Sequence, residues 1–168
     1  MMKQLSSKVF ACLLAGSVLP SALPAADVVS SRLLGLELAR DIAQGAIDAC
    51  RKEGYQVAVV VTDRSGDPVV VMRDVFVSKY MTQIAHNKAN AVVMSGSSSA
   101  ELRINMARIR DELNAVDGVL LMDGGLPIRV AGSLVGAVGV SGAPGGDKDE
   151  ACARQGMDAV QERIEFAD

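Results

Sequence analysis

The sequence is poor in aromatic residues: it has two Tyr, three Phe and no Trp among 168 residues. Proteins that bind single-stranded nucleic acid stack bases on aromatic side chains, and this chain offers few of them. Its formal net charge of −3 also argues against a protein that binds the phosphate backbone. We therefore expect no nucleic-acid partner.

Histidine is scarcer still, because His86 is the only one. A site with several histidine ligands for a metal is excluded, and a Ser-His-Asp triad has little support. Cys50 and Cys152 do not form a CxxC motif, and no Gly-Lys-Ser/Thr triplet indicates a nucleotide-binding P-loop. The common catalytic motifs therefore do not account for this chain.

The N-terminal segment has the pattern of a secretory signal peptide. Lys3 and Lys8 precede an apolar run over residues 9–19, and small residues follow up to Ala26. The apolar run is too short to span a membrane, so we predict a signal peptide over residues 1–25 that is cleaved after Ala25. The mature chain would have 15 basic and 20 acidic residues, no membrane span and a periplasmic or secreted location.

Residues 26–168 are predicted to form one domain, since 49% of the chain is hydrophobic and no linker or repeat interrupts it. Hydrophobic periodicity and turn residues predict four helices, over 35–52, over 78–94, from 98 onward and over about 147–165. The same signals predict five strands, over 57–62, 69–73, 119–122, 128–130 and 134–140. Hairpins rather than long crossovers connect the strands. The expected fold class is therefore α/β (α+β), with a five-stranded, mainly antiparallel sheet flanked by helices, and a Rossmann fold is excluded.

A glycine-rich segment over residues 124–152 is the most informative part of the chain. Gly132 and Ser133 are predicted at a hairpin tip, and the repeated glycines of the following strand indicate close approach of another backbone or of a ligand. The loop over 142–146 then leads into an acidic helix start. Such a loop is either a plain strand-to-helix connection or a seat for an anion at the helix N-terminus.

The predicted helix over 78–94 carries two candidate site residues on opposite sides. Lys88 falls within an apolar stripe, where a lysine should snorkel, pair or meet an anionic ligand. Together with the loop glycines it is a candidate anion site, made of Lys88, Gly142, Gly145 and Gly146. His86 lies on the polar side with Lys79, Thr82, Gln83 and Asn90, where it is either a solvated side chain or an iron ligand.

Four segments together resemble the GlcG/HbpS-type haem-binding family, which is also labelled haem-degrading. They are Leu36-Glu-Leu-Ala-Arg-Asp-Ile-Ala43, Val59-Val-Val-Thr-Asp-Arg-Ser-Gly66, Ala85-His-Asn-Lys-Ala89 and the long motif over 138–152. The resemblance covers residues 33–165 and implies five antiparallel strands flanked by helices. It also implies assembly into homo-oligomers. The implied ligand is haem or a related tetrapyrrole, as in the corrinoid-linked PduO C-terminal domain. Lys88 matches the family's recurrent lysine, whereas many members carry an aliphatic residue in place of His86.

The resemblance also bears on the two cysteines of the mature chain. If the first and last strands are antiparallel neighbours, as the resembled fold implies, the helix ends that carry Cys50 and Cys152 meet and a disulfide is expected in an oxidising compartment. The alternative is two free thiols in an apolar core.

Two functions from different classes follow. The first is an exported haem-binding protein with a role in haem sensing or degradation and with His86 as axial ligand. The alternative is an accessory or enzymatic protein that acts on a small carboxylate metabolite held by Lys88 and the glycine loop. A purely structural or sensor-partner role is a third reading.

Overall fold

Four strands form one antiparallel sheet in the order β2-β1-β4-β3, in a computed structural model that describes residues 30–167. The strands are β1 (Ala58–Asp63), β2 (Pro68–Arg73), β3 (Gly125–Val130) and β4 (Ser133–Ser141). All of them lie in one unit that begins at Ser31. The predicted signal peptide lies outside the described residues. The single antiparallel α+β domain is confirmed.

The prediction of a fifth strand over residues 119–122 is wrong. The backbone of this segment makes no ladder with the sheet. The Leu120 N–H instead donates to the carbonyl of Asn87, and the Leu121 N–H donates to the side-chain oxygen of Asn114. Leu121 buries its side chain against Ala91 and Leu102. An apolar run that packs under a helix has the same pattern as a short strand.

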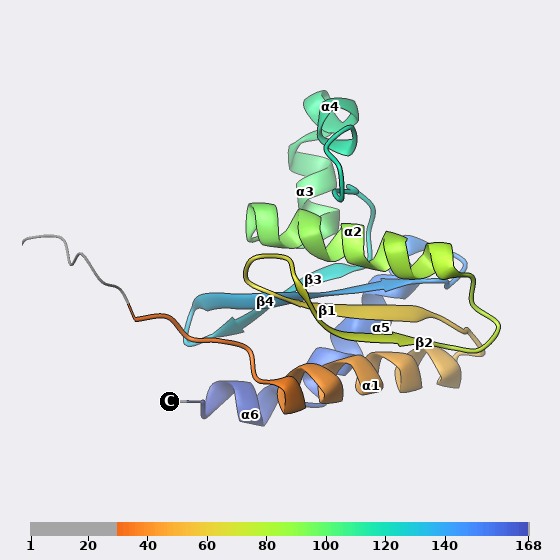
Figure 1. The fold of residues 1–168 in the computed structure, drawn as a ribbon. Coiled ribbons are helices and arrows are strands. Elements are labelled where there is room, and N and C mark those ends of the chain that lie inside the picture. Colours follow the sequence, from red (N-terminus) through yellow and green to blue (C-terminus); the bar gives the residue numbers. More distant parts are fainter. Residues whose placement is uncertain (1–29, 168) are drawn as a thin grey trace, which may run out of the picture. The chain divides into compact units, whose positions relative to one another are not determined.

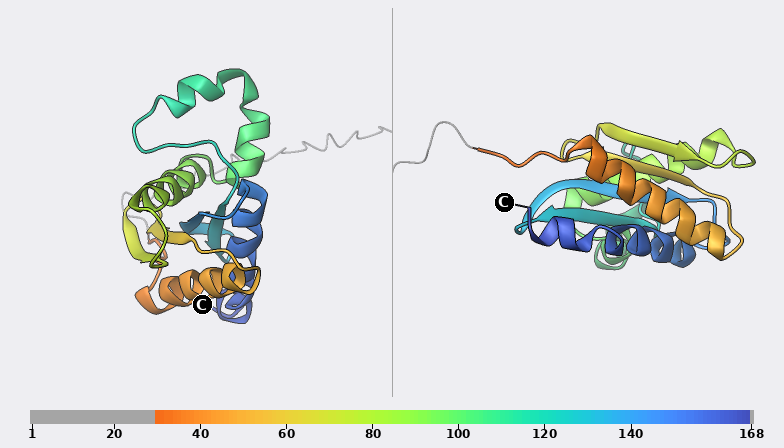
Figure 2. Two further views of the ribbon diagram at one scale, coloured as in Figure 1. Left: turned by 90° about the vertical axis from the view of Figure 1, so that its right-hand side faces the viewer. Right: turned by 90° about the horizontal axis from the view of Figure 1, so that it is seen from below.

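Helices cover both faces of the sheet (Figure 1). The helix α2 (Lys79–Ser95) lies on one face, where it contacts β1, β3 and β4. On the other face lie α1 (Leu36–Lys52), α5 (Gly146–Asp158) and the short α6 (Gln161–Glu165), and Figure 2 shows the same layers from two further sides. Most of the buried apolar side chains fill the layer between the sheet and α1 and α5.

The glycines of β4 allow α2 to lie directly on the sheet. A Cβ atom on Gly139 would come within 1.9 Å of the carbonyl oxygen of Ala85, and one on Gly125 of β3 would come within 2.7 Å of the carbonyl oxygen of Lys88. The sequence indicated that either another backbone or a ligand approaches the glycines closely, and in the structure it is the backbone of α2.

Two further sequence predictions are corrected by the backbone. The tip of the β3–β4 hairpin is Ala131-Gly132, both with positive φ (45° and 79°), because Val130 pairs with Ser133. The helix predicted from residue 98 onward begins with the expected capping box of Ser98 and Glu101, but it ends early.

That helix is divided into α3 (Ser99–Asn105), one 3₁₀ turn η1 (Ala107–Ile109) and α4 (Arg110–Asn114), which extend away from the sheet (Figure 1). The apolar residues that predict this helix recur at Leu102, Met106, Ile109 and Leu113. Leu102 is buried and Leu113 packs against its cluster, whereas Met106 and Ile109 are exposed. The middle of the segment has little surface to pack on, so its apolar periodicity does not produce a continuous helix.

The expected pairing of Cys50 with Cys152 is confirmed. The two side chains form a disulfide between α1 and the second turn of α5, with their Cα atoms 5.3 Å apart. Both residues are buried. The bond joins segments separated by 102 positions in the sequence.

Candidate functional site

The helix α2 positions both candidate side chains. It begins at Ser78, whose side chain accepts a hydrogen bond from the N–H of Tyr80, and it ends at Gly96 in the left-handed conformation. His86 and Lys88 are two positions apart, so they project from different sides of the helix. Lys88 points into the sheet, and His86 lies over the β1–β2 hairpin.

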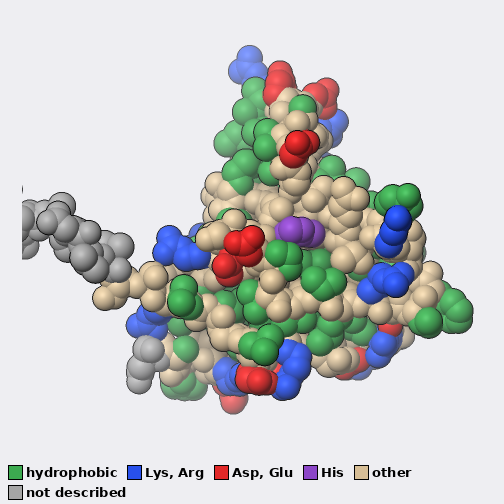
Figure 3. Space-filling model, in the orientation of Figure 1, with side chains coloured by type: hydrophobic (Ala, Val, Ile, Leu, Met, Phe, Trp, Pro, Cys, Tyr) green, Lys and Arg blue, Asp and Glu red, His purple; other side chains and the backbone are tan. Residues whose placement is uncertain are grey.

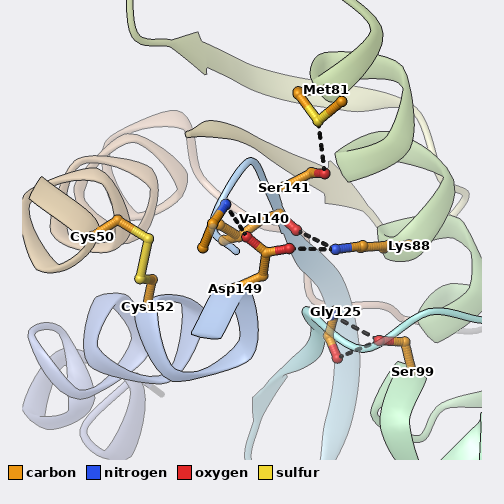
Figure 4. Close-up of polar contacts among 10 residues, drawn as sticks. Cys50, Met81, Lys88, Ser99, Gly125, Val140, Ser141, Asp149 and Cys152 are labelled. Carbon is orange, nitrogen blue, oxygen red and sulfur yellow. Dashed lines mark hydrogen bonds and ion pairs between the residues drawn. A yellow bond between two sulfur atoms is a disulfide. The ribbon is translucent and has the colours of Figure 1, made fainter. Parts of the chain in front are cut away.

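Lys88 is fully buried and its ammonium group is paired (Figure 4). Its Nζ atom donates to the carbonyl oxygen of Val140, at 2.9 Å, and to Oδ2 of Asp149, at 2.7 Å. The other oxygen of Asp149 accepts a hydrogen bond from the N–H of Ala143, at 3.0 Å. This cluster ties α2 to the glycine-rich loop and to the first turn of α5.

Burial raises the pKa of the Asp149 carboxyl group above its ordinary value, while the charge and hydrogen bond of Lys88 act in the opposite direction. Of the three fates predicted for Lys88, the structure therefore shows pairing with a carboxylate. Gly142 directly follows β4, and Gly145 and Gly146 lie at the start of α5, but the anion beside Lys88 is the protein's own Asp149. Binding of a further anion by this group stays a prediction.

His86 lies in the wall of an open groove between α2 and the β1–β2 hairpin. The groove has a volume of about 390 Å³. Its apolar part consists of side chains from the hairpin, namely Val60, Pro68 and Val71. Its polar part consists of Lys79, Thr82, Gln83 and His86 of α2. The histidine is visible from outside the molecule in Figure 3 (purple).

The hydrogen bond of His86 identifies its free ring nitrogen. Nε2 lies 2.8 Å from the carbonyl oxygen of Gly66 in the β1–β2 turn. A carbonyl oxygen only accepts, so Nε2 carries the proton of this hydrogen bond. In the neutral ring the lone pair is then on Nδ1, and the bond to Gly66 orients the imidazole.

The sequence grouped the polar residues of this groove correctly, because Lys79, Thr82, Gln83 and His86 share one side of a helix. It gave no indication of the apolar floor, which comes from a hairpin about twenty positions earlier. Over residues 30–167, no three His, Cys, Asp or Glu side chains lie close enough together to hold a metal ion. Among these residues, His86 therefore does not belong to a cluster of three or more such side chains.

These features define the class of the protein as a small α+β domain with an apolar surface groove that holds one imidazole. Residues 34–158 match the family model described as haem degrading protein HbpS-like, and the chain belongs to this family. No curated protein matches the chain by sequence.

Solved structures give the same result. A double mutant of Streptomyces reticuli HbpS is 32% identical in sequence to this chain and has a TM-score of 0.75. The match covers 86% of this chain and 99% of the HbpS chain. A further HbpS structure is 33% identical over 83% of this chain and 98% of that chain, with the same TM-score. A structure called PduOC:Heme complex has 21% identity and a TM-score of 0.69, over 76% of this chain and 95% of that chain, and shows the shared fold.

Proposed function

We propose that this protein binds haem in the groove beside α2, with His86 as the axial ligand from the protein. The observation that carries the proposal is that the only imidazole of the chain lies in the wall of an apolar groove, in a member of a haem-degrading family. A related fold has been solved in complex with haem. These findings support a haem-related function.

The groove suits a flat, mostly apolar ring. Its volume of about 390 Å³ lies within the usual range for small-molecule sites, and its floor is aliphatic. Val71 belongs to the edge strand β2 and is 53% exposed, so a ring that covers it removes apolar surface from water. The groove is open to solvent along one side, where the charged edge of such a ring can stay hydrated.

Lys79 supplies a positive charge at the rim. It lies two helical turns before His86 on the same side of α2, and its side chain is exposed beside the ring of Tyr80. An ammonium group at this position can pair with a propionate, and the charge-assisted hydrogen bond would fix the orientation of the ring in the groove.

His86 can reach iron through either ring nitrogen, with different consequences. Ligation through Nδ1 keeps the hydrogen bond to Gly66, whereas ligation through Nε2 requires the β1–β2 turn to release the ring. When bound, haem supplies an iron centre whose spectrum and potential depend on the axial ligand.

Titration with haemin tests the proposal. The purified protein is expected to give a saturable Soret band, and His86→Ala is expected to shift this band and to weaken haemin binding at least tenfold. Addition of free imidazole to His86→Ala should restore the wild-type spectrum. An unchanged spectrum and affinity in His86→Ala would remove His86 from the site, and absence of a saturable band in the wild type would contradict haem binding itself.

Lys79 has a matched control in Lys52, an exposed lysine at the end of α1 on the other face of the sheet. Lys79→Ala is expected to weaken haemin binding more than Lys52→Ala does. Equal effects of the two changes would mean that the lysine acts only through net charge.

We further propose that the protein is exported as a periplasmic or secreted homo-oligomer. The predicted signal peptide and the disulfide both support an oxidising compartment. Exposed apolar side chains on α3 and η1, such as Ile104 and Ile109, support association of several copies. Cell fractionation with N-terminal sequencing tests export, and light scattering of the purified protein tests association.

A further inference from the structure

A second cavity lies on the side of the molecule where α3, α4 and the start of α5 converge. Its volume is about 280 Å³. The residues that line it are Arg103, Arg110, Asn114, Leu120, Leu121, Met122, Asp123 and Gly146. None of them lines the groove that contains His86.

The two arginines of this cavity differ in how strongly they are paired with a carboxylate. Arg103 forms a two-pronged ion pair with Asp123, with Nε–Oδ1 at 2.6 Å and Nη2–Oδ2 at 3.1 Å. This pair holds Arg103 in place and cancels its charge. The nearest carboxylate to Arg110 within the described residues is Asp111, at 3.9 Å, and that side chain is 94% exposed. This contact is long and hydrated, so the guanidinium of Arg110 gives the cavity a positive charge that Asp111 balances only weakly.

Two further groups of the lining are donors. The side-chain oxygen of Asn114 is used by the N–H of Leu121, at 2.8 Å, which leaves its amide NH₂ group available. Gly146 is the first residue of α5, where backbone N–H groups have no partner within the helix. The carboxylate of Asp123 accepts from Arg103. A ligand that brings acceptors can therefore bind the guanidinium of Arg110 and the amide group of Asn114.

We propose that this cavity binds a small monocarboxylate. The planar guanidinium of Arg110 matches the two oxygens of a carboxylate, and its weakly compensated positive charge matches one negative charge. Leu120 and Met122 offer aliphatic surface to a short hydrocarbon chain. The sequence pointed to Lys88 as the residue for such an anion, but Lys88 is paired with the buried Asp149, whereas Arg110 has only a long contact with the exposed Asp111.

Two-dimensional NMR titration with sodium butyrate tests the inference. The amide signals of Leu121, Met122 and Gly146 are expected to shift to saturation, and Arg110→Gln is expected to weaken this binding at least tenfold. Arg108→Gln is the matched control, because it removes the same charge from the neighbouring η1 and does not line the cavity. Butyramide, which has the same chain without the charge, should give no saturable shifts.

Several outcomes would overturn the inference. They are absence of saturable shifts with butyrate, equal effects of Arg110→Gln and Arg108→Gln, or tighter binding of inorganic phosphate than of butyrate at the same amides. Circular dichroism shows whether Arg110→Gln keeps its fold. Haemin titration of Arg110→Gln is expected to match the wild type, so failure of carboxylate binding leaves the proposed haem site untouched.

Discussion

Lys88 and Asp149 lie almost fully inside the protein, where each charge depends on the other. The transfer of two charges from water is costly, and their attraction offsets that cost only when the geometry is good. Here each partner has a further backbone contact, Lys88 with Val140 and Asp149 with Ala143. The pair is therefore expected to determine the position of the glycine-rich loop rather than to add much net stability.

Removal of Lys88 tests whether the buried charge of Asp149 depends on its partner. Lys88→Met keeps the aliphatic stem but leaves a buried carboxylate without its cation, and we expect the free energy of unfolding at pH 7 to fall by about 3–5 kcal/mol. Burial already raises the pKa of Asp149, and loss of Lys88 removes the main opposing effect, so this pKa should rise further.

A raised pKa in the folded state determines the sign of the pH dependence. The variant keeps its stability below the pKa of the unfolded carboxyl group, near pH 4, and loses it as the pH rises through the folded pKa. The difference from wild type should therefore grow from pH 4 to pH 7 in urea denaturation. The double variant Lys88→Met/Asp149→Leu should recover most of the loss at pH 7. A loss below 1 kcal/mol in Lys88→Met would show that Lys88 is not paired in solution.

At the scale of secondary-structure elements, the contact between α2 and β4 sets the position of the groove. The backbone of α2 packs directly against glycines of the sheet, and this contact places His86 over the hairpin turn at Gly66. A side chain under the helix would lift it and change the distance between His86 and the floor of the groove.

Gly139→Ala tests this contact. Its Cβ atom would overlap the backbone carbonyl of Ala85, which cannot move without the whole helix, so we expect a loss of about 3 kcal/mol or more in unfolding free energy. Gly35→Ala is the control, because a Cβ atom there meets nothing within 4 Å. Guanidinium denaturation measures both, and a similar small loss in the two variants would contradict the close packing of α2.

The sequence predicts those elements whose apolar pattern fits only one kind of packing, and it fails where the same pattern fits more than one. The helix over 36–52 and the strands over 58–63 and 68–73 follow from periodicity and turn residues. The segment over 119–122 failed because a buried apolar run looks the same whether it pairs in a sheet or packs under α2. The helix from residue 98 failed because a repeating apolar pattern does not reveal whether any surface covers it.

At the scale of the whole molecule, the disulfide connects the two helices that cover one face of the sheet. The N-terminal helix α1 and the helix α5 near the C-terminus make extensive contacts, and the Cys50–Cys152 bond closes a loop that contains most of the domain. Within the described residues, no helix has both the length and the apolar composition to cross a membrane.

Loss of this bond is expected to destabilise the folded protein. For a loop of about a hundred residues, the chain-entropy treatment gives an upper value of roughly 4–5 kcal/mol. Dithiothreitol should lower the melting temperature of the wild type and leave Cys50→Ala/Cys152→Ala unchanged. If alkylation and mass spectrometry of the unreduced protein from its native compartment found two free thiols, the bond would be ruled out.

The candidate site could be predicted only in part, and the reason again lies in tertiary packing. Helical spacing in the sequence predicted that His86 and Lys79 lie on the same side of one helix. The aliphatic floor depends on how the β1–β2 hairpin crosses α2. The buried partner of Lys88 depends on the start of α5, sixty-one positions away. Neither relation is encoded in local spacing.

The central claim is that haem binds in the groove beside α2, and the location of bound haemin tests it most directly. Ferric haemin is paramagnetic and broadens the NMR signals of nearby amides. The account predicts that substoichiometric haemin broadens the amides of Val71, Thr82 and Gln83 first, and that this pattern is lost in His86→Ala. Broadening centred on Leu121 and Gly146, or confined to neither region, would contradict the account.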